Sequence, residues 1–342
     1  MKCARINGVK SIVTGDIPEP SSKNGEVIID VKKAGICGSD IHNWDLGQPE
    51  GLVMGHEFCG IVTDPGSRED LKIGDKVTAL PISPCGVCPA CKSGNVQYCP
   101  ATWTNAVGLS LENPGAYAPK CAIRPDMVVK IPETLTDNEV AMVEPAAVAL
   151  HAIHLADLEV GKKVLVIGAG IIGDLCAFFA KLNGASYVAV SETNPKRGKK
   201  SVDLGCADEY FDAKDPLFMQ NVLKECPYGY DVVVDCSGNS AAVTTALATS
   251  KPNGCVVLVG VSMDNISIPS ALLVLRELKV YGAIAYTPEE FNECIELINK
   301  NRINVEQFVD DIVSINDVQN AFERLTNGND DAIKILIDPN KN

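Results

Sequence analysis

The spacing of apolar residues changes near residue 160 of this 342-residue chain. Before that point, short apolar runs such as 27–31 and 60–62 alternate with turn residues, a pattern typical of short strands in an irregular, β-rich fold. After it, apolar runs of strand length alternate with helical segments, which predicts a parallel sheet covered by helices on both faces. The strands expected there are 163–167, 187–190, 230–235, 254–259 and 278–282, with a helix over 171–182.

The end of the chain changes pattern once more. From about Pro288 it becomes helical, and it ends with the apolar run 332–337, a strand expected to rejoin the first part. A chain of this length fits two domains comfortably. We therefore expect an α/β protein with a β-rich domain of residues 1–150, completed by 286–342, and a doubly wound domain of residues 151–285.

Composition narrows the class of protein. Hydrophobic residues make up 46% and charged residues 22% of the chain, as in globular proteins. The formal net charge of −14 disfavours nucleic acids and anionic membranes as partners, since both are negatively charged. No apolar run approaches the roughly 20 residues needed to span a bilayer, and the N-terminus lacks the apolar run of a secretory signal. We therefore expect a cytoplasmic location.

A glycine motif follows the expected strand 163–167 and opens the expected helix. It reads Gly168-Ala169-Gly170-Ile171-Ile172-Gly173. In a GxGxxG motif the first glycine allows a tight turn, the second lets the backbone approach a pyrophosphate, and the third lets helix and strand pack closely. The helix N-terminus then favours the anion. The motif predicts a dinucleotide site at the ends of the strands, for which Val259, at the end of a later strand, is a further candidate.

An acidic residue stands at the end of the next expected strand. Glu192 lies nineteen residues after Gly173, where it could accept hydrogen bonds from both ribose hydroxyls and repel a 2′-phosphate, which favours NAD over NADP. Lys196, Arg197 and Lys199 lie close by and could instead hold that phosphate. The alternative interpretation of these basic residues is a solvated start of a helix.

The 14 cysteines fall into two groups. Four lie within fifteen residues in the pattern C-x2-C-x2-C-x7-C, and four thiolates at this spacing can enclose a tetrahedral zinc, leaving no position for substrate. An iron–sulfur cluster and a nucleic-acid-binding zinc ribbon are the alternatives, the latter disfavoured by the acidic charge. Others, such as Cys176, Cys236, Cys255 and Cys294, are expected to be small buried hydrophobic residues. The clustered group is Cys85, Cys88, Cys91 and Cys99.

A second set of residues suits an open metal site. Cys37, the pair His56-Glu57 and Glu144 supply one thiolate, one imidazole and one or two carboxylates. Such ligands satisfy zinc while leaving room for an alcohol oxygen. Taken singly, each of these residues is more often an ordinary structural residue than a ligand.

Five motifs in chain order connect these observations. They are Gly35-Ile36-Cys37-Gly38-Ser39-Asp40-Ile41-His42, Gly55-His56-Glu57-Phe58, the four clustered cysteines, Glu144-Pro145 and the glycine motif. In them the chain resembles, over its whole length, the zinc-containing medium-chain dehydrogenases, most closely the branch of sorbitol, threonine and butanediol dehydrogenases. The resemblance implies a GroES-like catalytic domain, a Rossmann domain, two zinc ions per chain, NAD, and a homodimer or homotetramer.

The resemblance also implies roles for individual residues. Cys37, His56 and Glu144 correspond to zinc ligands, and Glu57 to a carboxylate that binds the metal directly or through water. Asp40 corresponds to the partner that orients His56. The residues Ser39 and His42 correspond to a relay that passes the alcohol proton through the cofactor ribose to solvent.

The expected activity is hydride transfer between NAD and a small secondary alcohol, diol or polyol. Sorbitol dehydrogenases carry an arginine where this chain has Gly282-Ala283-Ile284-Ala285-Tyr286, which puts a sorbitol-like substrate in doubt. Dehydrogenases of 3-hydroxy-amino acids or of sugar phosphates are alternatives within the family. A metal-free reductase and a non-catalytic zinc-binding interaction protein are alternatives of other kinds. Trp103 and Tyr286 are candidate pocket walls, whereas His151 and His154 are interpreted as structural.

Overall fold

The computed structural model describes residues 1–262 and 265–341. Contacts between residues divide the chain into two compact units. We call residues 1–145, 287–327 and 334–342 the β-rich unit. Residues 146–286 and 328–333 form the second, which we call the parallel-sheet unit. The chain thus returns to the first unit after residue 286 and crosses back briefly at residues 328–333.

The β-rich unit is built on a seven-stranded sheet in the order β14-β15-β3-β4-β5-β7, with β6 also pairing with β3. Its last strand, β15, pairs antiparallel with β3 and parallel with β14, so the terminal apolar run does rejoin the first part of the chain. The strands are β1 (Lys2–Ile6), β2 (Ile12–Asp16), β3 (Val27–Gly35), β4 (Glu57–Asp64), β5 (Lys76–Ala79), β6 (Lys120–Ile123), β7 (Val128–Lys130), β14 (Asp311–Ser314) and β15 (Ile335–Asp338).

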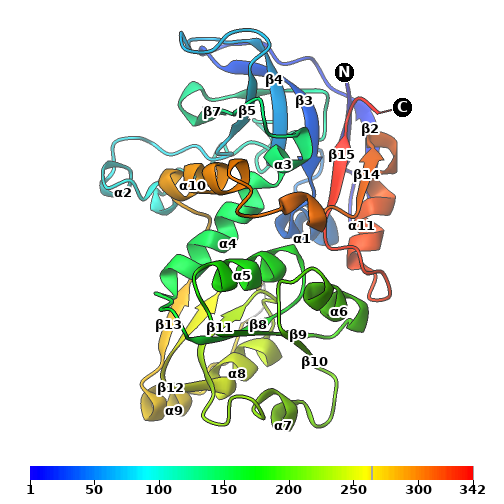
Figure 1. Ribbon diagram of the computed structural model, residues 1–342. Helices are drawn as coiled ribbons and strands as arrows, with labels where there is room; N and C mark the ends of the chain where they lie inside the picture. Colours follow the sequence, from blue (N-terminus) through cyan, green and yellow to red (C-terminus); the bar gives the residue numbers. More distant parts are fainter. Residues whose placement is uncertain (263–264, 342) are drawn as a thin grey trace. The chain divides into compact units, whose positions relative to one another are not determined.

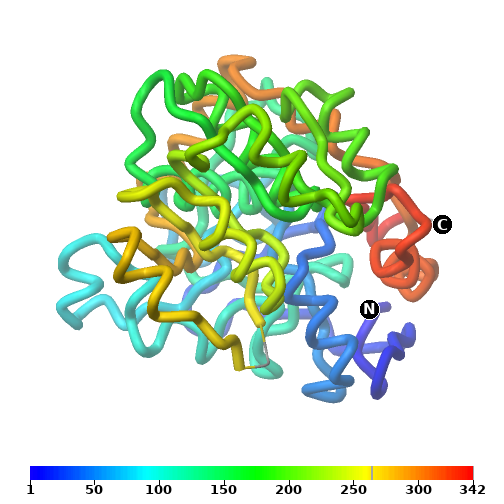
Figure 2. The backbone as a smooth tube through the Cα atoms, turned by 90° about the horizontal axis from the view of Figure 1, so that it is seen from below, coloured from blue at the N-terminus to red at the C-terminus, as the bar shows by residue number. Residues whose placement is uncertain are grey.

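Helices and turns complete this unit, and both chain ends lie on the same side of it (Figures 1 and 2). The C-terminal segment is held there because Asn340 Nδ2 donates a hydrogen bond of 2.7 Å to Val31 O. The elements are α1 (Gly38–Leu46), α2 (Pro89–Lys92), η1 (Val96–Tyr98), η2 (Pro125–Met127), α3 (Asp137–Ala141), α4 (Val143–Leu155), which runs into the second unit, α10 (Pro288–Asn299), η3 (Val305–Phe308), η4 (Ile315–Asp317) and α11 (Val318–Thr326).

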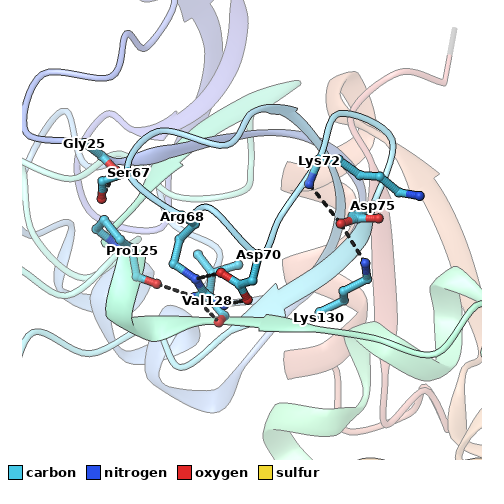
Figure 3. Close-up of polar contacts among 9 residues, drawn as sticks. All are labelled: Gly25, Ser67, Arg68, Asp70, Lys72, Asp75, Pro125, Val128 and Lys130. Carbon is cyan, nitrogen blue, oxygen red and sulfur yellow. Dashed lines mark hydrogen bonds and ion pairs between the residues drawn. The ribbon is translucent and has the colours of Figure 1, made fainter.

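The loop between β4 and β5 is fixed to the segment that leads into β7 (Figure 3). Arg68 donates hydrogen bonds of 2.6 Å and 2.9 Å from Nη1 to the carbonyls of Pro125 and Val128. Further along, Lys130 in β7 forms an ion pair of 2.8 Å with Asp75. Strand β7 is at one end of the sheet order and pairs with β5, which in turn pairs with β4, the strand that begins with Glu57. These contacts therefore hold this edge of the sheet.

The parallel-sheet unit has six strands in the order β10-β9-β8-β11-β12-β13, all paired in parallel. This is the order of a doubly wound sheet, and the expected α/β class is confirmed. Figure 1 shows α5 on one side of the sheet and α8 on the other. The elements are β8 (Lys163–Ile167), α5 (Ile171–Leu182), β9 (Tyr187–Glu192), α6 (Pro195–Asp203), β10 (Glu209–Asp212), α7 (Phe218–Val222), β11 (Tyr230–Asp235), α8 (Ser240–Thr249), β12 (Ser250–Leu258), α9 (Ser270–Arg276) and β13 (Lys279–Gly282).

Central strands of this sheet are apolar throughout because helices cover both faces. In β8 four of the five residues, 164–167, are buried, and α5 packs its own buried face against β8 and β9. Within residues 1–262 and 265–341, no helix is both long and apolar enough to cross a bilayer.

Candidate functional site

The first candidate ligand lies where β3 gives way to α1. Cys37 occupies the N-cap position of α1 in an extended conformation, and its backbone N–H donates a 3.1 Å hydrogen bond to Asp40 Oδ2. Gly47 ends the helix with a φ of 65°, a conformation that glycine adopts without strain. The short helix therefore holds Cys37 and Asp40 in a defined relation.

Asp40 connects this helix to the start of β4. Its side chain is fully buried and accepts a 2.8 Å hydrogen bond from the Tyr117 hydroxyl. Its other oxygen, Oδ1, lies 3.5 Å from Nδ1 of His56, which directly precedes β4. Because Nδ1 faces the carboxylate, Nε2 is the ring nitrogen left for a metal, and it lies 3.4 Å from Ser39 Oγ.

Burial and charge determine the protonation of this group. Burial raises the pKa of Asp40, although His56, Cys37 and Tyr117 act in the opposite direction. For His56, burial would lower the pKa, but the charges of Asp40 and Cys37, with a contribution from Glu144, raise it well above its ordinary value. The surroundings of His56 are thus strongly favourable to positive charge, as expected of a site built to hold a cation.

A buried ion pair stands next to this group. Glu57, 1% exposed, pairs with the fully buried ammonium group of Lys334, which also donates a 3.0 Å hydrogen bond to Ile36 O. A side chain at Gly35 would collide with this pair, since a Cβ there would lie 2.9 Å from Lys334 Cε. The glycine at the end of β3 therefore leaves the space that the pair occupies.

The structure brings three of the four expected ligands of the open site together. Single ligand atoms of Cys37, His56 and Glu57 all lie within 4.8 Å of one another. Glu144, in the first turn of α4, is buried and near enough for its charge to affect His56. One thiolate, an imidazole whose far nitrogen faces a carboxylate, and buried carboxylates are a donor set that suits zinc.

The expected proton-relay residues lie on one helix face beside this group. Ser39 is exposed, and His42, one turn later on α1, is half-buried. Residues three apart on a helix are neighbours on its surface. The hydroxyl of Ser39 thus lies near the His56 imidazole and on the same helix face as a second imidazole, that of His42.

The four clustered cysteines also come together. Sulfur atoms of Cys85, Cys88, Cys91 and Cys99 lie within 4.8 Å of one another. Hydrogen bonds from the backbone N–H groups of Cys85 and Ala101 lower the pKa of Cys99 to about 6. Backbone donors lower the pKa of Cys85 as well. Amides that stabilise thiolates are typical of thiolate–metal centres, so this group also fits zinc.

The glycine motif forms the turn that its sequence predicts. Gly168 follows β8 with a φ of 100°, and a Cβ at Gly173 would collide with Gly168 O. At Gly170, the N-cap of α5, a Cβ would meet open space. The twelve-residue helix α5 begins with Ile171 and Ile172, so its N-terminus lies next to the open space at Gly170. A helix N-terminus beside such open space fits a pyrophosphate.

Glu192 ends β9 next to this loop. Its Oε2 accepts a 2.8 Å hydrogen bond from Ala169 N, and its Oε1 accepts one of 2.8 Å from Asn194 N. Val259 directly follows β12, and its N–H donates to Asp235 O at 2.8 Å. Gly168, Glu192 and Val259 therefore all lie at the carboxyl ends of parallel strands, one edge of the sheet. Arg197, in the first turn of α6, is half-buried.

The sequence did not predict two residues that contact the site, Tyr117 beside Asp40 and Lys334 beside Glu57. The apolar run 332–337 contains a single lysine, and a charge inside an apolar strand is the signal that marks a buried partner. Cys59, near His56, contacts a different carboxylate: burial raises the pKa of its thiol, which donates to Asp137 at 3.6 Å.

Comparison with known protein families matches both units. Residues 23–133 match the family described as alcohol dehydrogenase GroES-like domain. Residues 172–300 match the family described as zinc-binding dehydrogenase. The first match covers the Cys37–His56 group and the four cysteines, and the second covers most of the parallel sheet.

Relatives align over almost the entire chain. A probable D-xylulose reductase A of Emericella nidulans is 31% identical over 97% of this chain and 94% of the relative. The crystal structure of 2R,3R-butanediol dehydrogenase from Bacillus subtilis is 28% identical with a TM-score of 0.87, covering 99% of both chains. A putative zinc-binding dehydrogenase from Sinorhizobium meliloti, bound to NADP, is 28% identical with a TM-score of 0.85, again covering 99% of both chains.

Proposed function

Because this chain belongs to the zinc-containing medium-chain alcohol dehydrogenase family, we propose that it oxidises a small secondary alcohol, diol or polyol with NAD. The enzyme is a zinc-dependent oxidoreductase with a nicotinamide cofactor and a small-molecule substrate. The observation that supports the site most directly is the meeting of Cys37, His56 and Glu57 beside buried Glu144.

We assign the reactive zinc to Cys37, His56 and Glu144, with Glu57 as the carboxylate that can approach the metal. When bound, zinc supplies Lewis acidity that eases deprotonation of the alcohol, and the nicotinamide accepts the hydride. Asp40 holds the ring of His56 through Nδ1, and Tyr117 and the Cys37 N–H hold Asp40. The chain thereby fixes the imidazole before substrate enters.

The alcohol proton leaves through side chains of α1 in this proposal. Ser39 both donates and accepts hydrogen bonds, and the imidazole of His42, one turn later, can accept and release a proton. The cofactor ribose would supply hydroxyl groups to this relay when bound. The nucleotide itself is assigned to Gly168, Gly170, Ile171, Ile172, Gly173, Glu192, Arg197 and Val259.

Substrate choice is supported by the relatives and by this chain's own residues. A relative named for xylulose and a neighbour named for butanediol both act on hydroxyl-bearing carbon chains, as their names state. The segment Gly282-Ala283-Ile284-Ala285-Tyr286 offers no cation to a polyol hydroxyl, and Tyr286 is buried as packing. A short diol or a polyol smaller than sorbitol therefore fits best.

Turnover and metal content together test this function. We expect reduction of NAD, followed at 340 nm, with at least one alcohol from a panel of diols, pentitols, hexitols, 3-hydroxy-amino acids and sugar phosphates. Elemental analysis should give two zinc ions per chain. One zinc per chain with no turnover on any alcohol would instead point to a zinc-binding interaction protein or a metal-free reductase.

Substitution of Cys85 tests the four-cysteine group separately. In Cys85→Ser we expect loss of one zinc and a lower midpoint of thermal unfolding, because a closed thiolate site contributes folding free energy. The zinc at Cys37 should remain, since it shares none of these ligands. Elemental analysis and thermal denaturation check the result, and an unchanged melting temperature would contradict a structural role.

We also propose that the enzyme assembles as a homodimer or homotetramer. Strand β13 stands at the end of the sheet order, with one edge unpaired within the described residues. Exposed apolar side chains lie on this strand and on the preceding helix α9: Tyr281 of β13 is 42% exposed, and Val274 and Leu275 of α9 are 73% and 83% exposed. An open edge beside apolar surface is normally covered in native proteins, and a second copy of the chain would cover it.

A further inference from the structure

Two cysteines of the parallel-sheet unit meet beside the glycine motif. Cys176 lies in the second turn of α5, and Cys236 directly follows β11. The Cys236 thiol donates to Cys176 Sγ at 4.0 Å, and the Cys176 thiol in turn donates to Ala149 O at 3.9 Å. The two sulfur atoms therefore face each other, as the two halves of a disulfide would.

The two thiols differ in their access to solvent. The sequence predicts that both residues are buried, and Cys176 is fully buried, but Cys236 is half-buried and is the one that a small oxidant can reach. Its hydrogen bond to Cys176 and its burial raise the pKa of the Cys236 thiol well above its ordinary value, with smaller contributions from Asp235 and Asp174. Because the thiolate is the form that reacts with oxidants, the pair should respond to sustained rather than brief exposure to an oxidant.

The segments that carry the two cysteines both pack against the glycine loop. A Cβ at Gly168 would lie 3.5 Å from Cys236 C, so the end of β11 lies against the first glycine of the motif. Gly173, one turn before Cys176 on α5, is in close contact with the same glycine, because a Cβ there would collide with Gly168 O. Residues three apart share a face of a helix. A bond that draws the two cysteines together would therefore act on the loop at Gly168.

We propose that Cys176 and Cys236 form a disulfide in the presence of a peroxide, and that this bond weakens binding of the nicotinamide dinucleotide. The proposal rests on the proposed nucleotide site. Hydrogen peroxide oxidises the Cys236 thiol to a sulfenic acid and is itself reduced to water. The Cys176 sulfur then attacks the Cys236 sulfur, which forms the disulfide and releases the sulfenic oxygen as a second water, with the thiol proton.

The expected effect on the nucleotide site follows from the distances. A disulfide bond is about 2.05 Å long, so the two sulfur atoms must approach by roughly 2 Å. Helix α5 has no free space toward the loop at Gly173, so a shift of the helix displaces the turn at Gly168. That turn and the helix N-terminus are the parts assigned to the pyrophosphate. Reduction by a dithiol should restore both.

Peptide mapping and NADH binding test the two halves of the proposal on the zinc-loaded enzyme. After treatment with hydrogen peroxide and its removal, mass spectrometry of a non-reduced digest should find a peptide pair joined through Cys176 and Cys236. The dissociation constant for NADH, measured by nucleotide fluorescence, should rise at least about fivefold, the lower end of ordinary coupling between sites. Dithiothreitol should reverse both changes.

Two variants separate this pair from the other cysteines. Cys176→Ser keeps every assigned zinc ligand, so oxidation of metal-binding cysteines would affect it as it affects the wild type. Its dissociation constant for NADH should change less than about twofold on the same treatment, below the range of ordinary coupling. Cys255→Ser is the matched control, because Cys255 is buried in β12 beside Val232, four residues before Cys236 along β11. It should respond to peroxide as the wild type does.

Three results would overturn this inference and leave the dehydrogenase assignment intact. They are the absence of a link between Cys176 and Cys236, a linked enzyme with unchanged affinity for NADH, and an equal loss of NADH binding in Cys176→Ser. If the reduced wild-type enzyme bound neither NADH nor NADPH, the proposed nucleotide site itself would be wrong, and the effect on binding with it.

Discussion

Replacement of Cys37 by serine should reduce alcohol oxidation by about a thousandfold or more, because Lewis-acid stabilisation is worth several kcal/mol and each ~1.4 kcal/mol is a factor of ten. A serine hydroxyl is a far weaker zinc ligand than a thiolate. The backbone bond from residue 37 to Asp40 does not depend on the side chain, so α1 should keep its start. Elemental analysis should find one zinc per chain, retained by the four cysteines.

Cys59→Ser provides the control for this substitution. Cys59 lies on β4 two residues after Glu57, is buried, and contacts Asp137. The Cys59→Ser protein should keep two zinc ions and most of the wild-type turnover. If Cys37→Ser retained near wild-type turnover, or two zinc ions, the assigned metal chemistry would be wrong. A Cys59→Ser protein that lost one zinc would likewise contradict the assignment of ligands.

The parallel-sheet unit could be predicted closely because its signals are local. Strand 163–167, helix 171–182 and strand 230–235 have the predicted bounds, since each is a run of apolar residues delimited by glycine, lysine or polar residues. Strand β12 begins at Ser250, four residues before the predicted start at Gly254. Residues 251–253 are Lys251, Pro252 and Asn253, of which the last two are exposed, so no apolar signal marks them.

Helix α1 was not predicted, for a related physical reason. It buries only Asp40 and Trp44, too few side chains to produce a helical pattern of apolar residues. Trp44 packs on Phe322 with ring centroids 5.7 Å apart, so it belongs to the core. That contact joins residues 278 positions apart, which no local pattern reports.

Prediction of the site from sequence is limited in the same way, because some of its contacts join distant parts of the chain. Cys37, His56 and the four cysteines carry recognisable motifs, whereas the partner of Glu57 does not. Lys334 lies 277 residues from Glu57 along the chain and meets it only because β15 pairs with β3. From sequence, the apolar run around Lys334 predicts a strand, but the neighbour of that strand, and hence the charge that the lysine balances, depends on the tertiary fold.

Replacement of Lys334 by methionine should lower the free energy of unfolding by about 3–5 kcal/mol, because it leaves the carboxylate of Glu57 buried without its partner. Methionine approximates the length of the lysine side chain and should fill the space beside Gly35. Ile36 O would also lose the donor that Lys334 supplies. Chemical denaturation of the zinc-loaded enzyme measures the change.

Two further variants separate loss of charge balance from loss of packing. In Glu57→Gln/Lys334→Met no buried charge remains, so most of the lost stability should return even if turnover does not. Lys120→Met breaks a comparable ion pair of 2.7 Å with Glu19, but both side chains are at the surface, and unfolding should hardly change. If Lys334→Met resembled Lys120→Met, or if the double variant were no more stable than Lys334→Met, the buried pair would not be what holds Glu57 in place beside Cys37 and His56.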